Sequence, residues 1–274
     1  MNREPLRAVT DDEIETFDRD GVVLLKGLFD AEWVARLREL ADIDMNSSGE
    51  LKHELVEPGG DGRFYVNTFL WPRNDAFRDF VFNSPASQLA ASVMGANKIN
   101  IVFDQFLIKE PETPKPTVWH QDLPYWPING DKVCTLWLAL DEVTVDSGAV
   151  EYVKGSHKWG NRYAAVAFRP DIEYSEQLPP VPDIDAVRDE LEFVIYELEP
   201  GDCTLHHGLS VHGAGGNMSS ERRRRAYTTR WAGDGVTYYP RDGIQPMLWE
   251  PDIEEGQALD CDLWPKVWPR AGTA

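Results

Sequence analysis

The sequence predicts an α+β protein that is mainly β, in which helices come first and short antiparallel strands follow. Helix-capping signals and helical spacing of apolar residues dominate residues 1–97. From residue 98 the apolar runs become short or alternating and are separated by Gly, Pro and Asp, which is typical of an antiparallel sandwich or closed barrel. The chain has 274 residues and no obvious linker, so we expect one domain.

The helical signals begin close to the amino terminus. Thr10 and Glu13 fit a capping box ahead of a first helix, which Gly21 ends. The run VVLL at 22–25 is the one strand expected in this part of the chain. Asp30 caps a second helix, AEWVARLRELAD, whose large apolar side chains share one face.

Two further helices are expected at 75–82 and 86–94, and the polar, Gly-rich segment 47–64 is expected to be a surface loop. Together these elements make 1–97 a mainly helical flank. Residues 98–235 then form the β core and 236–274 a carboxy-terminal extension. The strands expected in the core are INIVFDQFLI, VCTLWLAL, GAVEYV, EFVIYEL, CTLHH and RRRAYTTRW.

Composition excludes several classes of function. The net charge of −20 repels phosphate backbones and anionic lipid surfaces, so we expect no nucleic-acid or membrane partner and, weakly, a neutral or cationic small-molecule substrate.

The three cysteines lack C-x-x-C spacing and are expected to be free thiols. No apolar run approaches the roughly 18 residues that span a bilayer, and the first residues do not resemble a signal peptide. The expected location is cytoplasmic.

The stretch WHQDLPYWPINGD carries the first chemical signal, because His120 and Asp122 would point the same way in a strand and could share one ion. A third ligand is expected from a later strand, where His206, His207 and His212 crowd together. Two imidazoles and one carboxylate form the facial triad of non-haem Fe(II) oxygenases, and the absence of Cys disfavours structural zinc. We expect His120, Asp122 and His212 to bind the metal and His206 and His207 to line the strand end.

Such an iron takes its extra electrons from a 2-oxo acid, whose far carboxylate needs a fixed cation. The segment ERRRRAYTTRW supplies one, and arginine binds a carboxylate through two parallel hydrogen bonds. Arg224 is our choice for this anchor, with Arg223 and Arg225 as the competing registers. In a strand its face would be shared by Arg222, Ala226, Thr228 and Arg230.

The order and spacing of these motifs resemble the phytanoyl-CoA dioxygenase family of Fe(II)/2-oxoglutarate oxygenases. The likeness rests on HQD with LPYWP behind it, TLWLALDEVTVDSGAVEYVKGSHKWG, HGAGGN and RRAYTTRW, with weaker support from FDRDGVVLLKGLF. It implies a double-stranded β-helix, a cupin-like jelly roll with helices flanking its amino-terminal side. It also implies that Thr135 and Trp137 flank the 2-oxoglutarate, and Gln105 could face it from the preceding strand. Ala214 departs from the serine that the family often has after the last histidine.

The resulting hypothesis is a dioxygenase that uses Fe(II), 2-oxoglutarate and O₂ to oxidise an unactivated C–H bond. Asp122 is present, so hydroxylation or a related oxidation is expected rather than halogenation. Two alternatives stay open: a cupin-type metalloenzyme that uses no 2-oxo acid, and an inactive relative that only binds a ligand. Specificity is expected to lie in the irregular segments 46–64, 125–132, 162–190 and 237–274.

Overall fold

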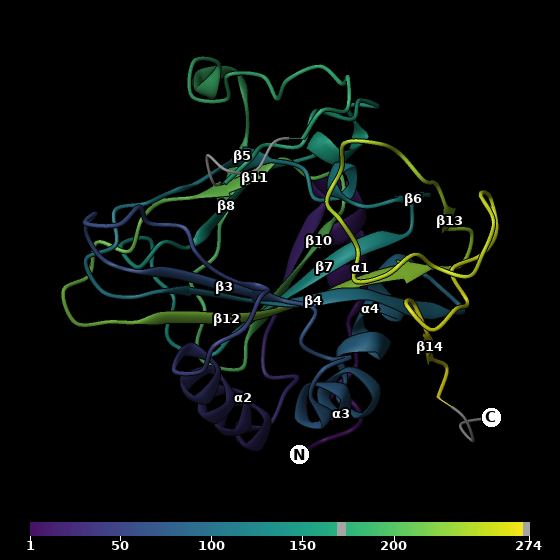
Figure 1. The fold of residues 1–274 in the computed structure, drawn as a ribbon, viewed down its shortest axis with the longest axis horizontal. Helices are drawn as coiled ribbons and strands as arrows, with labels where there is room; N and C mark the ends of the chain where they lie inside the picture. Colours follow the sequence, from purple (N-terminus) through teal and green to yellow (C-terminus); the bar gives the residue numbers. More distant parts are fainter. Residues whose placement is uncertain (169–173, 271–274) are drawn as a thin grey trace.

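A computed structural model describes residues 1–168 and 174–270 of the chain. Two antiparallel sheets lie against each other, with helices on the far side of the larger one (Figure 1). In these residues the larger sheet runs in the order β1 (Val22–Leu25), β10 (Cys203–His207), β7 (Val133–Ala139), β12 (Arg224–Gly233), β4 (Ile99–Lys109), β3 (Phe64–Thr68) and β2 (Lys52–Glu54), with β14 (Lys266–Trp268) also paired to β4.

The smaller sheet has the order β5 (Thr117–His120), β11 (His212–Ala214), β8 (Val150–Val153) and β9 (Phe193–Ile195). A separate pair joins β13 (Thr237–Tyr238) to β6 (Ile128–Asn129). Single turns of 3₁₀-helix occur at η1 (Leu123–Tyr125), η2 (Ser156–Lys158) and η3 (Arg188–Glu190). Because consecutive strands cross between the two sheets, the topology is that of a double-stranded β-helix, which confirms the predicted fold class.

The four predicted helices are present: α1 (Asp11–Asp20), α2 (Ala31–Met45), α3 (Asp75–Asn83) and α4 (Ala86–Met94). The capping box before α1 has both of its hydrogen bonds, and Gly21 ends this helix with a φ of 78°, which glycine tolerates best. Asp30 accepts the Trp33 amide at the start of α2. Figure 1 shows α2 and α3 below the large sheet, on the side away from β5, β8 and β11.

The expectation of a single strand in 1–97 was wrong. β2 and β3 also belong to this part of the chain, and β3 pairs with β4 along its whole length. The sequence FYVNT of β3 is buried along most of its length and therefore lacks the alternation that marks a half-exposed strand. The Gly-rich segment before it is thus a hairpin that extends the sheet. The division of the chain at residues 97 and 235 stays a prediction.

The strand β12 lies between β7 and β4, and its two faces contact different parts of the protein. On the outer face Tyr227 packs edge-on against Phe80 of α3, with ring centroids 5.1 Å apart. On the inner face Thr228 lies opposite Trp137 of β7 and Gln105 of β4. The inner face therefore points away from the helices and toward the smaller sheet.

Two of the cysteines, Cys134 and Cys203, are fully buried in the large sheet, and burial raises the pKa of both thiols. They pack as small apolar side chains, as expected for Cys134, and all three cysteines are free.

Among the helices of residues 1–168 and 174–270, none has the length and apolar character needed to cross a bilayer.

The carboxylate of Asp104 links the start of the segment after β3 to β12. It accepts the amides of Leu70 and Trp71 at 2.7 and 2.9 Å and a hydrogen bond from the Tyr227 hydroxyl. Burial raises the pKa of Asp104 to about 6, although these hydrogen bonds act in the opposite direction. Asp104 is therefore ionised, and a strong acceptor, above that pH.

We predict that Tyr227→Phe lowers the free energy of unfolding by about 2 kcal/mol at a pH well above the pKa of Asp104, because a hydrogen bond to a buried charge is lost. The raised folded pKa means that Asp104 becomes protonated as the pH falls through about 6, so the loss should shrink there. Urea unfolding at both pH values measures it. An equal loss at both would contradict the assignment of the charged acceptor.

Candidate metal centre

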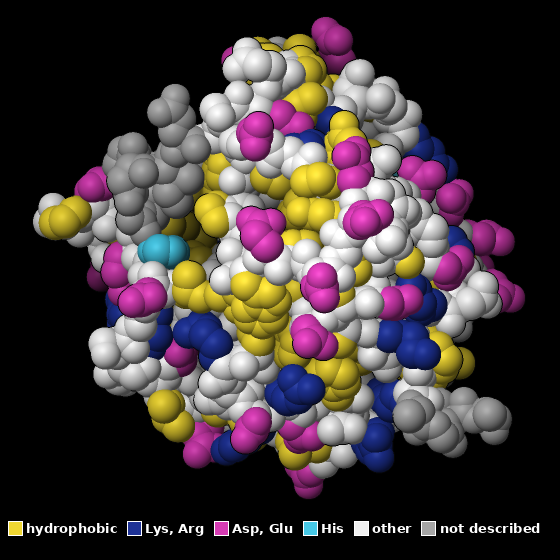
Figure 2. Space-filling view, turned by 45° about the vertical axis from the view of Figure 1, so that its right-hand side comes forward, with side chains coloured by type: hydrophobic (Ala, Val, Ile, Leu, Met, Phe, Trp, Pro, Cys, Tyr) yellow, Lys and Arg dark blue, Asp and Glu magenta, His cyan; other side chains and the backbone are white. Residues whose placement is uncertain are grey.

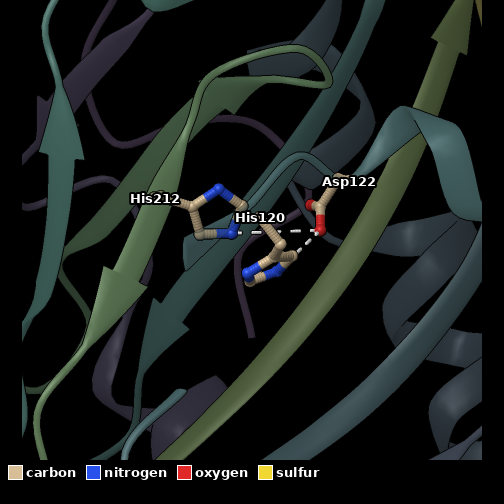
Figure 3. A group of neighbouring side chains, drawn as sticks. All are labelled: His120, Asp122 and His212. Atoms are coloured by element: carbon tan, nitrogen blue, oxygen red, sulfur yellow. Dashed lines mark ion pairs between the residues drawn. The ribbon is translucent and has the colours of Figure 1, made fainter. Parts of the chain in front are cut away.

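Three side chains converge on one point of the cavity lining: those of His120, Asp122 and His212. His120 ends β5 and lies opposite His212 of the neighbouring β11, with ring centroids 4.2 Å apart. The Nε2 atoms of the two rings lie 3.6 and 3.9 Å from Oδ1 of Asp122. One ligand atom from each residue lies within 4.8 Å of the others, and all three residues are buried. Figure 3 shows the three side chains facing a common centre.

The reason given from sequence for this convergence was wrong for Asp122. The strand β5 ends at His120, and Asp122 has helical backbone angles (φ −77°, ψ −46°) at the start of η1. A turn of the chain, rather than the alternation of a strand, therefore brings the carboxylate back toward the imidazoles. The sequence LPYWP marks this turn, because proline is tolerated in the first turn of a helix, where its missing N–H is not needed, and Pro124 lies within η1.

Hydrogen bonds from the outer ring nitrogens fix both histidines in the form that binds a metal. Nδ1 of His120 lies 2.8 Å from the carbonyl oxygen of Val118, and Nδ1 of His212 lies 3.0 Å from that of Ser210. A carbonyl only accepts, so each Nδ1 carries the proton and each Nε2 presents a lone pair to the centre. Burial, together with the nearby His120 and His206, lowers the pKa of His212 well below its usual value, which keeps the ring neutral.

The two oxygens of Asp122 have different surroundings. Oδ2 accepts the Thr135 hydroxyl at 2.5 Å and lies 3.1 Å from Nε2 of His206, whereas Oδ1 faces His120 and His212. Burial by itself would raise the pKa of Asp122, but His120, His206 and His212 more than offset it and lower this pKa well below 3.8. The carboxylate is thus ionised and offers one oxygen to a metal. An ion-binding set of two imidazoles and one carboxylate oxygen fits Fe(II).

His206 has a different position from the one expected. It lies opposite Thr135 in the pairing of β10 with β7, and its ring contacts the Asp122 carboxylate instead of lining a strand end. His207 points the other way, with Nε2 2.6 Å from the carbonyl of Asp131. The alternation of β10 could have shown that only one of these two histidines faces inward.

The four consecutive arginines divide between surface and interior. Arg223 forms ion pairs with Asp42 and Glu110 at 2.7 and 2.8 Å, and Arg225 pairs with Asp141 at 2.8 Å. Arg222 pairs with Glu142 at 3.0 Å. These arginines act at the outer surface of the sheet.

Arg224 is the member of this run that points inward. It is 2% exposed, and its Nε and Nη2 atoms make no hydrogen bond within the described residues. Its guanidinium carbon lies 5.5 Å from the ring centroid of Trp137. Burial lowers the pKa of Arg224 to about 10, so the side chain is still charged at neutral pH. A buried cation with free donors is the feature expected of a carboxylate anchor.

A cavity of about 550 Å³ joins these groups. Every site residue predicted from sequence lines it: His120, Asp122, His212, Arg224, Thr135, Trp137 and Gln105. Its outer walls come from all four segments expected to set specificity, and include Leu51, His53, Tyr125, Trp126, Phe168, Tyr174 and Ile244; positions 169–173 and 271–274 of those segments lie outside the described residues. The surface carries scattered acidic side chains, with hydrophobic ones gathered near the middle of one face (Figure 2).

A buried His-Asp-His group in a double-stranded β-helix defines a non-haem iron oxygenase. The family model described as phytanoyl-CoA dioxygenase (PhyH) matches residues 17–226, so the chain belongs to this family. It is therefore an Fe(II)- and 2-oxoglutarate-dependent dioxygenase, with iron and 2-oxoglutarate as its cofactor and co-substrate.

Curated relatives agree with the family, and solved structures agree with the fold. The chain is 26% identical over 219 residues to a probable alpha-ketoglutarate-dependent hypophosphite dioxygenase of Stutzerimonas stutzeri, covering 74% of this chain and 72% of that protein. It is 24% identical over 255 residues to phytanoyl-CoA dioxygenase 1 of Oryza sativa subsp. japonica, covering 80% and 88%. The crystal structure of the carbocyclase SnoK from nogalamycin biosynthesis superposes with a TM-score of 0.76 at 22% identity, covering 97% of this chain and all of the other.

We predict that His206→Leu weakens metal binding by about ten-fold or more, because Oδ2 of Asp122 loses one of its two hydrogen bonds and the carboxylate can rotate. Co(II) titration of the metal-free protein, followed by visible absorption, measures the affinity without any turnover. His206→Gln, which keeps a donor, should recover part of it.

The matched control is His207→Gln, which changes the neighbouring ring that points away from the centre. Its affinity for Co(II) should equal that of the unchanged protein. If His206→Leu also binds Co(II) normally, then His206 does not position the carboxylate.

Proposed function

We propose that the protein hydroxylates an unactivated C–H bond of a small organic molecule, with 2-oxoglutarate converted to succinate and CO₂. The observation that carries the proposal is the buried triad sharing one cavity with the buried guanidinium of Arg224, whose Nε and Nη2 atoms have no partner among the described residues. In this proposal His120, Asp122 and His212 hold the ion. Fe(II), when bound with 2-oxoglutarate and O₂, supplies the oxidising chemistry, and the protein supplies placement.

Arg224 is proposed to hold the far carboxylate of 2-oxoglutarate. Its free Nε and Nη2 atoms lie on one edge of the guanidinium and can donate two parallel hydrogen bonds to a carboxylate. Its three neighbours in the arginine run all have acidic partners, which supports this register over Arg223 and Arg225. Trp137 lies against the guanidinium and contributes to this end of the cavity. Thr135 lies opposite Arg230 in the pairing of β12 with β7 and acts through its hydrogen bond to Asp122.

The cavity volume of about 550 Å³ lies within the range of roughly 300–1,000 Å³ that is usual for small-molecule sites. The rings of Tyr125 and Phe168 lie against His120, and the carboxylate of Asp122 occupies the ligand position that a halogenase would leave to a halide. Both features support oxygen transfer to a small molecule. The three free cysteines, two of them fully buried, agree with the cytoplasmic location, which stays a prediction.

We predict that anaerobic addition of Fe(II) and 2-oxoglutarate produces a visible charge-transfer band, because the 2-oxo acid chelates the ion through two oxygens. His212→Ala should abolish this band by removing one ligand. Absorption spectroscopy with matched iron content measures both. Tight iron binding without a band would instead favour a cupin-type metalloenzyme that uses no 2-oxo acid.

We predict that Arg224→Met raises the dissociation constant for 2-oxoglutarate by about 100-fold, because two hydrogen bonds to a buried charge are lost. Titration of the charge-transfer band measures this constant. Arg223→Met removes an arginine from the same run at the surface and should leave the constant unchanged. The reverse pattern would move the anchor to Arg223.

A further inference from the structure

A second arginine lines the same cavity and has no role in the function proposed so far. Arg230 lies on β12 six residues beyond Arg224, on the same face of the strand and about 20 Å along it. Its side chain is 5% exposed. The strand thus presents one buried cation at each of two positions along the cavity.

The partners of Arg230 are neutral. Its Nη2 donates to Oε1 of Gln105 at 2.7 Å and its Nη1 donates to the Thr228 hydroxyl. Its Nε is buried and makes no hydrogen bond to the part of the chain that the structure describes. Within the described residues no carboxylate forms an ion pair with this side chain. Burial lowers the pKa of Arg230, but a guanidinium stays protonated in proteins.

The two acids that act on Arg230 at longer range are committed elsewhere. Asp122 faces the metal centre, and Asp104 accepts two backbone amides and the Tyr227 hydroxyl on the other side of the sheet. The charge on Arg230 is therefore only partly balanced. Burying a cation without a close counter-charge costs several kcal/mol, so such an arrangement is expected where a ligand provides the partner.

One molecule of 2-oxoglutarate cannot supply the counter-charge for both Arg224 and Arg230. Apart from the end that would chelate the metal, 2-oxoglutarate has a single carboxylate, and Arg224 is proposed to bind it. The two arginines also have different surroundings. Arg224 lies beside Trp137, which belongs to a hydrophobic cluster with Leu107 and Val150, whereas Arg230 lies over the ring of Phe103 at 4.6 Å. The Arg230 end of the cavity is therefore left for the substrate.

The walls near Arg230 are aromatic. Phe103 packs against Phe69 and Trp126, with ring centroids 5.1 and 5.5 Å apart, and these residues line the cavity. Beyond them Tyr125 stacks on Phe168 at 6.1 Å. A molecule bound here would place an apolar body between rings and a polar end at the guanidinium.

We propose, resting on the function given above, that Arg230 and Gln105 form the recognition end of the substrate site and that the substrate is a small carboxylic acid with an apolar, ring-sized body. The carboxylate would accept from Nε of Arg230 and from the side-chain amide group of Gln105, whose only side-chain hydrogen bond within the described residues is the one that its Oε1 accepts from Arg230. This assigns Gln105 to the substrate in place of the 2-oxoglutarate contact expected from the sequence. This proposal differs from the expectation of a neutral or cationic substrate, which rested on the net charge of −20. The two arginines that line the cavity give it a local positive charge.

The test compares 3-phenylpropionate with 3-phenylpropanamide, which have the same ring and chain but differ in charge. Each is titrated anaerobically into the protein loaded with Fe(II) and saturating 2-oxoglutarate, so that Arg224 is already occupied. Binding is followed by tryptophan fluorescence and by the charge-transfer band. We expect the acid to bind at least about ten-fold more tightly than the amide, as two charged hydrogen bonds predict.

Arg230→Met should abolish this preference, and Arg230→Lys should keep part of it because the charge is retained. Arg223→Met, which removes a surface arginine, should keep all of it. Arg230→Met should also keep the charge-transfer band and the affinity for 2-oxoglutarate, which shows that the variant is folded and that the proposed function stands.

Three results would overturn this inference while leaving the proposed function intact: equal binding of acid and amide, no binding of either, or a preference that survives in Arg230→Met. A large loss of 2-oxoglutarate affinity in Arg230→Met would also overturn it, because Arg230 would then hold the co-substrate. Absence of the band in the unchanged protein is different, since it removes the proposed function itself.

Discussion

The position of the Asp122 carboxylate is the constraint on which the rest of the site depends. Thr135 and His206, from two neighbouring strands of the large sheet, hold one oxygen. The other oxygen faces His120 and His212, which pair across two strands of the small sheet. The carboxylate thus joins both layers, and the metal centre forms only when the sheets pack in the correct register.

The inner face of β12 differs from the metal centre, because its positive charges have no acidic partner among the described residues. Arginines directed outward find Asp42, Asp141 and Glu110, which fasten the strand to its surroundings. Arg224 and Arg230 are directed inward, where the described residues offer no acid within ion-pair distance. Strand alternation therefore separates arginines that stabilise the fold from arginines available to ligands.

Local signals in the sequence were sufficient for the helices, and the order of the motifs was sufficient to select His120, Asp122 and His212, which the structure brings together. The capping box at Thr10 and the glycine at 21 act within one turn, so the sequence alone places the ends of α1. The backbone turn at Asp122, the inward ring of His206 and the strand β3 depend on partners far along the chain. Arg224 could be proposed from the sequence because its motif is local, whereas the neutral neighbours on which the proposal for Arg230 rests became visible only in the structure.

The origin of the cavity walls has a consequence for how such a protein can change. The iron and co-substrate residues stand on paired strands or next to them, but Leu51, Phe168 and Ile244 come from separate stretches of chain that surround the entrance. Insertions or substitutions in those stretches change the shape of the cavity that a substrate enters, without disturbing the hydrogen bonds between the strands. Evolution can therefore redirect such an enzyme toward new molecules while its oxidising machinery is inherited whole.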